Sequence, residues 1–149
     1  MKTIIFSLLL ALSFKPFSCS KSQNTVPSSE IIGTWSGTYT VDQLPDNAPM
    51  KYRFVIGENG KLFTAGFGAD GREYYHEGTW KMKGNTFTAT YTTTNRYWST
   101  VTQSAKMTYV NGRFVDATWT DVKNPDGHLD GKFQNLTREN SVAANSSLY

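Results

Sequence analysis

Residues with metal-binding side chains alternate near the end of the chain, at Asp126, His128 and Asp130. Alternate residues of a β-strand project to one side, so carboxylate and imidazole groups at this spacing could hold a metal ion. In a strand they would lie on the face opposite to the apolar Leu129 and Phe133, and a glycine-containing turn lies at their start. The pattern therefore favours an exposed hairpin end, and we expect no metal site.

The sequence carries no catalytic constellation. Glu73 and Glu77 share one strand face, but this spacing separates their α-carbons by roughly 13 Å. The intervening Tyr75 favours a solvated face over the paired carboxylates of a glycosidase. Neither His76 nor His128 lies in a motif that would activate a serine or threonine nucleophile. We therefore expect a non-enzymatic protein without catalytic residues or a cofactor, and a barrel cyclase or isomerase is a weaker alternative.

The first residues have the composition of an export signal. Residues 1–3 give a short basic start, residues 4–14 are apolar, and residues 18–20 are small. The apolar stretch is far shorter than the roughly 20 residues that a membrane-spanning helix needs. Residues 1–19 are therefore interpreted as a targeting segment and not as an anchor helix.

Cys19 is the only cysteine in the chain, so no disulfide stabilises the folded part. If Cys19 becomes the first mature residue and is acylated, the protein is a lipoprotein of the cell envelope, held to a bacterial membrane only through that lipid. Pro16 and Phe17 make the lipobox loose. The alternative is ordinary cleavage after Ser20, which removes the cysteine and gives a soluble secreted protein.

The charge of the chain argues against nucleic-acid binding. The formal net charge is +3, but Lys2 and Lys15 lie in the expected signal while every acidic residue lies after it. The mature chain is therefore close to neutral, and its lysines and arginines do not cluster into a phosphate-binding surface. We expect a monomer that does not bind nucleic acid.

One domain is expected between two polar ends. Residues 20–30 and 140–149 have little apolar content and cannot offset the entropy of ordering, so a flexible tether and a flexible tail are expected there. Residues 31–139 remain as the folded domain. Their number is near the usual size of a domain with one core.

Within that domain, apolar and aromatic residues alternate with threonine, serine and charged residues, which is typical of strands with one buried face. The runs are separated by turns rich in glycine, asparagine and proline, and Asn111-Gly112 is a strong signal for a tight hairpin. About eight strands and no convincing helix predict an all-β fold, a single antiparallel up-and-down β-barrel. The predicted strands are 31–41, 50–56, 61–67, 73–82, 86–94, 98–110, 113–121 and 128–137.

The same alternation predicts an aromatic lumen. Gly-Thr-Trp or Ala-Thr-Trp recurs at Trp35, Trp80 and Trp119, and these indoles are expected on the inner face. Gly37 and Gly131 are also expected on the inner face of their strands. A glycine at such a position either lets the strand bend or leaves space in the lumen. A barrel of eight strands is filled by its own side chains or holds one small ligand. The candidate lumen residues for ligand binding are Trp35, Tyr39, Phe54, His76, Trp80, Tyr91, Gln103 and Trp119.

Residues 32–39 (IGTWSGTY), 78–87 (GTWKMKGNTF) and 129–136 (LDGKFQNL) together resemble bacterial lipocalin-like lipoproteins of the calycin type. The resemblance spans most of the domain and implies a closed barrel that binds a small hydrophobic molecule. The chain departs from lipocalins because it has no readable C-terminal helix and no cysteine pair. Its opening Gly-Thr-Trp is also similar to avidin-like barrels, although no residue set here indicates biotin.

Two functions remain from different classes. The preferred one is an exported, lipid-anchored barrel that binds a small hydrophobic ligand in its lumen without catalysis. The alternative is a filled barrel whose loops or outer face bind another protein, as small periplasmic inhibitors of hydrolases do. Both depend on a closed barrel with its tryptophans inside.

Overall fold

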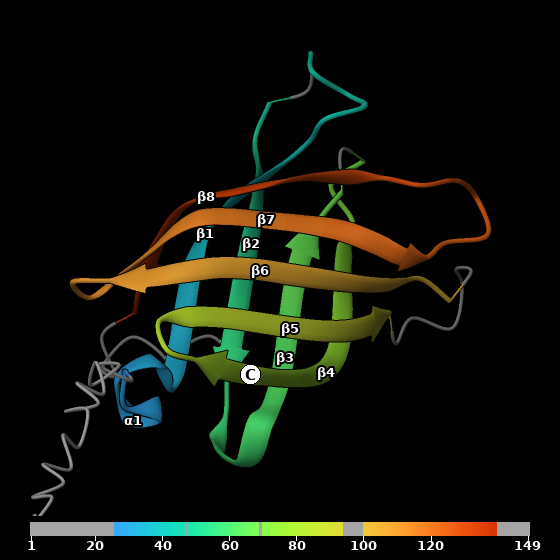
Figure 1. Cartoon of the computed structure of the whole chain (residues 1–149). Coiled ribbons are helices and arrows are strands. Elements are labelled where there is room, and N and C mark those ends of the chain that lie inside the picture. Colours follow the sequence, from blue (N-terminus) through green and yellow to red (C-terminus); the bar gives the residue numbers. More distant parts are fainter. Residues whose placement is uncertain (1–25, 47, 69, 94–99, 140–149) are drawn as a thin grey trace, which may run out of the picture.

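The computed structural model describes residues 26–46, 48–68, 70–93 and 100–139. They form a closed barrel in which each antiparallel strand pairs with its neighbours in sequence, and β8 closes the barrel against β1 (Figure 1). The expected all-β, up-and-down barrel of eight strands is thereby confirmed. The strands are β1 (Gly33–Val41), β2 (Met50–Ile56), β3 (Lys61–Phe67), β4 (Glu73–Lys83), β5 (Thr86–Thr93), β6 (Thr102–Val110), β7 (Arg113–Lys123) and β8 (Asp130–Arg138).

Strand boundaries agree with the sequence best where turn chemistry is strongest. β2 and β3 have the predicted limits, and the β6–β7 turn has positive φ at both Asn111 (50°) and Gly112 (80°). β6 begins at Thr102, and residue 98, the predicted start of this strand, lies outside the described residues. β8 begins two residues later than predicted, because the turn that follows β7 continues through residue 129.

A one-turn helix, α1 (Ser28–Ile31), occupies the end of the segment expected to be a flexible tether. Its last residue, Ile31, is fully buried, and Val26 packs against the same core. The buried indole N–H of Trp35 donates a hydrogen bond to the carbonyl oxygen of Ile31 at 2.8 Å. Two apolar side chains in a polar segment are thus enough to order residues 26–31 against one end of the barrel. Within the described part of the chain, no helix has the length and apolar character required to cross a membrane.

The hydrophobic core extends along the barrel, and Tyr52, Trp119 and Phe133 at the end opposite α1 belong to it. The expected inward indoles of Trp35 and Trp119 are 1% and 5% exposed, while Trp80 is half-buried and stacks on Phe87 with ring centroids 5.8 Å apart. Edge-to-face contacts between aromatic rings add to the burial of apolar area. The most deeply buried side chains are Trp35, Tyr91, Phe54, Phe87, Ile31, Ile56, Met107 and Thr64.

The registers of the described strands shift at three places; one lies between Thr102 and Gln103, and the other two are bulges with a residue of positive φ. Asn135 has a φ of 54°, and the register of β1 against β8 shifts between Ser36 and Thr38. In a regular strand Phe133 and Leu136 would lie on opposite faces, but after the shift both are buried inside the barrel. Asp116 (φ 50°) marks the second bulge, in β7. Each bulge adds one residue to a strand and so changes which parity faces the core.

Candidate functional site

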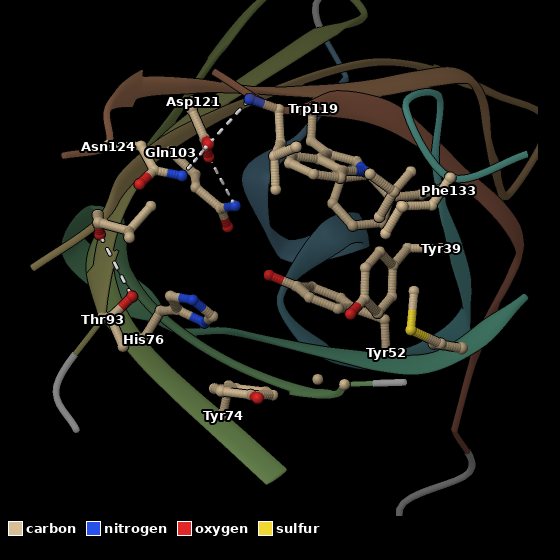
Figure 2. A pocket seen from close by; sticks show the side chains of 17 residues that line it. Tyr39, Tyr52, Tyr74, His76, Thr93, Gln103, Trp119, Asp121, Asn124 and Phe133 are labelled. Carbon is tan, nitrogen blue, oxygen red and sulfur yellow. Dashed lines mark hydrogen bonds between the residues drawn. The ribbon is translucent and has the colours of Figure 1, made fainter. Parts of the chain in front are cut away.

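The end of the barrel opposite α1 contains a cavity of about 280 Å³, and most of its lining residues lie at the strand ends there. Residues from all eight strands or the loops beside them surround it, and β3 contributes only glycine (Figure 2). The lumen is therefore packed in one half and open in the other. Its lining consists of Tyr39, Tyr52, Tyr74, Trp119 and Phe133, of Val41, Leu44, Met50, Val101 and Leu129, of Gly66 and Gly68, and of the polar His76, Thr93, Gln103, Asp121 and Asn124.

The structure separates the predicted lumen residues into two groups. Tyr39, His76, Gln103 and Trp119 line the cavity. The remaining four, Trp35, Phe54, Trp80 and Tyr91, do not line it and belong to the packed core or lie against it.

Sequence reasoning missed several lining residues that its own alternation could have found. Each lies two residues from a predicted inward residue on the same strand and so shares its face: Tyr52 with Phe54, Tyr74 with His76, and Asp121 with Trp119. Leu44 and Asn124 lie outside the strands, so no periodicity in the sequence points to them.

A chain of polar side chains runs under the cavity from β2 to β4. The hydroxyl of Tyr52 donates to Thr64 Oγ1 at 2.9 Å, and Thr64 Oγ1 lies 3.1 Å from His76 Nδ1. Thr64 is fully buried. Because Tyr52 donates to it, the Thr64 hydroxyl keeps its own proton available for Nδ1, and donation to Nδ1 leaves the proton of the neutral imidazole on Nε2.

His76 itself is 7% exposed. Burial lowers the pKa of His76 to about 4, and the nearby charge of Asp121 offsets only part of that effect. The imidazole is therefore neutral at pH 7. The ring of Tyr91 meets it edge-on at 5.4 Å, and the buried Tyr91 hydroxyl interacts with that of Tyr52 without a hydrogen bond of normal geometry within the described ranges.

A second polar cluster surrounds the carboxylate of Asp121 on the opposite wall. Gln103 Nε2 donates to Oδ1 at 2.9 Å. Asn124 Nδ2 at 2.6 Å and the backbone N–H of Leu129 at 3.1 Å both donate to Oδ2. Asp121 is 6% exposed, so these three donors replace water around its charge.

Aromatic rings form the remaining wall. Tyr39 meets Tyr52 and Trp119 at centroid distances of 5.4 and 6.1 Å, in edge-to-face geometry. The Tyr39 hydroxyl donates to the Phe67 carbonyl oxygen at 2.9 Å, and burial raises the pKa of Tyr39 to about 12. These rings have satisfied polar edges, which leaves their apolar faces as the wall of the cavity.

The alternating Asp126, His128 and Asp130 lie away from this cavity. His128 Nε2 is 3.6 Å from Asp130 Oδ2, and both side chains are largely exposed. No group of three metal-binding side chains comes together in the parts of the chain that the structure describes.

Comparisons with known proteins address the fold. No protein-family model matches the sequence, and no curated protein matches it. Among solved structures, the chain is similar to a redesigned beta barrel, mFAP1, bound to DFHBI, with a TM-score of 0.50 and 22% sequence identity. The match covers 72% of this chain and 97% of that one. At this identity the likeness shows a common fold.

Proposed function

We propose that this protein binds a small, largely apolar molecule in the open half of its barrel and does not transform it. The observation that carries the proposal is the cavity of about 280 Å³, which has aromatic and aliphatic walls and two localised polar clusters. This composition is typical of ligand sites, and the volume is close to the lower end of their range. The similar redesigned barrel is bound to DFHBI, which supports ligand binding by a barrel of this fold.

A direct test uses the neutral apolar dye N-phenyl-1-naphthylamine, whose fluorescence rises in an apolar site. Dye binding should be saturable with one site per chain. Leu129→Trp places a larger side chain at the cavity and should weaken binding at least tenfold. Val122→Trp is the matched control, because Val122 is 63% exposed and does not line the cavity.

Native mass spectrometry of protein purified from its own organism gives an independent measurement. A retained small molecule, lost in Leu129→Trp and kept in Val122→Trp, would support the proposal. Absence of both a retained molecule and saturable dye binding contradicts it.

Protein binding through the outer wall is a second candidate, and one observation favours it. Val55, Phe63, Phe67 and Tyr75 on β2, β3 and β4 are each between 37% and 40% exposed, and the rings of Phe63 and Tyr75 stack at 5.8 Å. Clustered apolar side chains on an outer face are typical of interaction surfaces. If dye binding fails, Phe63→Lys should abolish capture of a partner that the unaltered protein retains.

Export and lipid anchoring are proposed from the sequence alone, because residues 1–25 lie outside the described part. The composition of residues 1–20 supports an envelope lipoprotein acylated at Cys19, with simple secretion after Ser20 as the alternative. Intact mass of the mature protein distinguishes the two. Cys19→Ser should release an acylated protein from the membrane fraction and leave the mass of a secreted one unaffected.

A further inference from the structure

Two polar atoms remain unpaired at the cavity after the internal hydrogen bonds are assigned. The first is His76 Nε2. Tyr52 donates to Thr64, so the Thr64 hydroxyl has its own proton available for His76 Nδ1 at 3.1 Å, and we assign the imidazole proton to Nε2 on this basis. Nε2 has no hydrogen-bond partner within the described ranges. His76 therefore offers one N–H donor to whatever occupies the cavity.

The second atom is the amide oxygen of Gln103. Asp121 is a carboxylate that already accepts hydrogen bonds from Asn124 and Leu129, so the group that Gln103 turns toward it must be its NH₂. The amide orientation is thus determined by chemistry, and Oε1 points away from Asp121. Figure 2 shows the Gln103 amide and the His76 imidazole facing the same open space.

Donor and acceptor come from strands that are separated by one other strand. His76 lies on β4 and Gln103 on β6, and Gln103 is paired with Tyr91 of the intervening β5. Their side chains reach the cavity over the buried Tyr91 ring, which contacts His76. A ligand edge with an acceptor and a donor is the chemical complement of these two atoms, which line the same cavity.

The charge around the cavity favours an uncharged ligand. Among the described residues that line it, Asp121 is the only carboxylate, and no lysine or arginine is present. An anionic headgroup would meet the charge of Asp121 and a neutral imidazole, with no lining cation within the described ranges.

We propose that the ligand is a planar, uncharged ring system with an amide-type edge, as in a lactam or imide. Its carbonyl oxygen accepts from His76 Nε2–H, and its N–H donates to Gln103 Oε1, while the rings of Tyr39 and Trp119 contact its apolar part. The inference rests on the proposed function and specifies the class of ligand for that same site. A site built to form hydrogen bonds discriminates strongly against analogues that lack them, because its buried polar atoms are then left unpaired.

The test titrates four probes into the purified protein by calorimetry: 2-quinolone, 1-methyl-2-quinolone, indole and decanoate. The first has the complete edge, the second lacks its donor, the third lacks its carbonyl, and the last is an apolar anion. We expect 2-quinolone to bind at least tenfold more tightly than each of the others.

Variants then assign each hydrogen bond to a residue. Gln103→Leu should remove the preference for 2-quinolone over its N-methyl analogue, and His76→Phe should remove the preference over indole. Gln134→Leu and His128→Phe are the matched controls, because both residues are exposed and lie away from the cavity. Both controls should keep the preferences of the unaltered protein.

A measurement on the unaltered protein does not depend on the folding of any variant. Nitrogen-15 spectra of the imidazoles should show His76 with its proton on Nε2. A proton on Nδ1 overturns the inference, as does equal binding of the three bicyclic probes or tighter binding of decanoate. In each of these results the proposed ligand-binding function survives. If no probe binds, N-phenyl-1-naphthylamine included, the proposed function itself fails.

Discussion

The indole N–H of Trp119 donates a hydrogen bond of 3.0 Å to the carbonyl oxygen of Thr40, which lies 79 residues earlier in the chain. The bond crosses over Gly131, which pairs with Trp119 on one side and with Val41 on the other. A Cβ at residue 131 would lie 1.9 Å from the Thr40 oxygen and 2.8 Å from Trp119 Nε1. Gly131 was a candidate for leaving space for a ligand. The structure shows instead that its missing side chain makes room for the indole ring of Trp119 on the neighbouring strand.

Gly131→Ala should destabilise the protein by about 2 to 4 kcal/mol, because the new methyl group overpacks the seam and displaces the indole. Urea unfolding measures the change in free energy. Gly57→Ala is the control, since its Cβ would be 3.3 Å from the nearest atom and its φ is −96°. The control should change stability by less than about 1 kcal/mol, and equal effects of the two variants would contradict the role assigned to Gly131.

The stability of the protein should depend on pH through His76. In the unfolded chain this histidine takes up a proton near pH 6.5, whereas burial lowers its folded pKa to about 4. Its contribution is therefore complete above pH 6.5, decreases as the pH falls from 6.5 to about 4, and changes no further below that. The full loss corresponds to roughly 3 kcal/mol.

Urea unfolding of the unaltered protein and of His76→Phe between pH 4 and 7 isolates this contribution from that of the carboxylates. The difference in unfolding free energy between the two proteins should decrease toward pH 4. His128→Phe removes the exposed histidine and should retain the pH dependence of the unaltered protein. A constant difference across the range would show that His76 is not the group responsible.

Tyr52 and Tyr91 should respond unequally to removal of their hydroxyls, although both are buried. Tyr52→Phe removes the donor to Thr64 and should cost about 1 to 2 kcal/mol. The Tyr91 hydroxyl interacts with that of Tyr52 without a hydrogen bond of normal geometry in the described part, so Tyr91→Phe should change stability by less than about 1 kcal/mol. Thermal or urea unfolding of the pair measures this contrast, and equal losses would mean that the Tyr91 hydroxyl is satisfied in solution.

Ile31→Ala should cost about 2 to 4 kcal/mol, because Ile31 is fully buried and its carbonyl accepts the Trp35 indole N–H. Leu44→Ala is the matched control at the opposite end, where Leu44 is 47% exposed beside the cavity. Unfolding in urea should show at most about 1 kcal/mol for that control. A negligible effect of Ile31→Ala would mean that α1 does not stabilise the packed end.

Much of the site's composition was predictable because it depends on local alternation. Tyr39, His76, Gln103 and Trp119 were expected inside and line the cavity. Their depth in the barrel was not predictable, since Trp35 and Trp119 occur in similar sequence contexts at opposite ends of the lumen. Sequence periodicity gives the face of a strand on which a side chain lies, and no position along the barrel axis.

An all-β barrel, most of its strand limits and its aromatic interior follow from the amino-acid sequence, because strand alternation and turn chemistry act over a few residues. The division into a packed half and a hollow half is visible only in the folded protein. That division depends on the register of paired strands, on the bulges at Asp116 and Asn135, and on α1 covering one end. These features arise from hydrogen bonds and contacts between residues far apart in the chain, which no local pattern encodes.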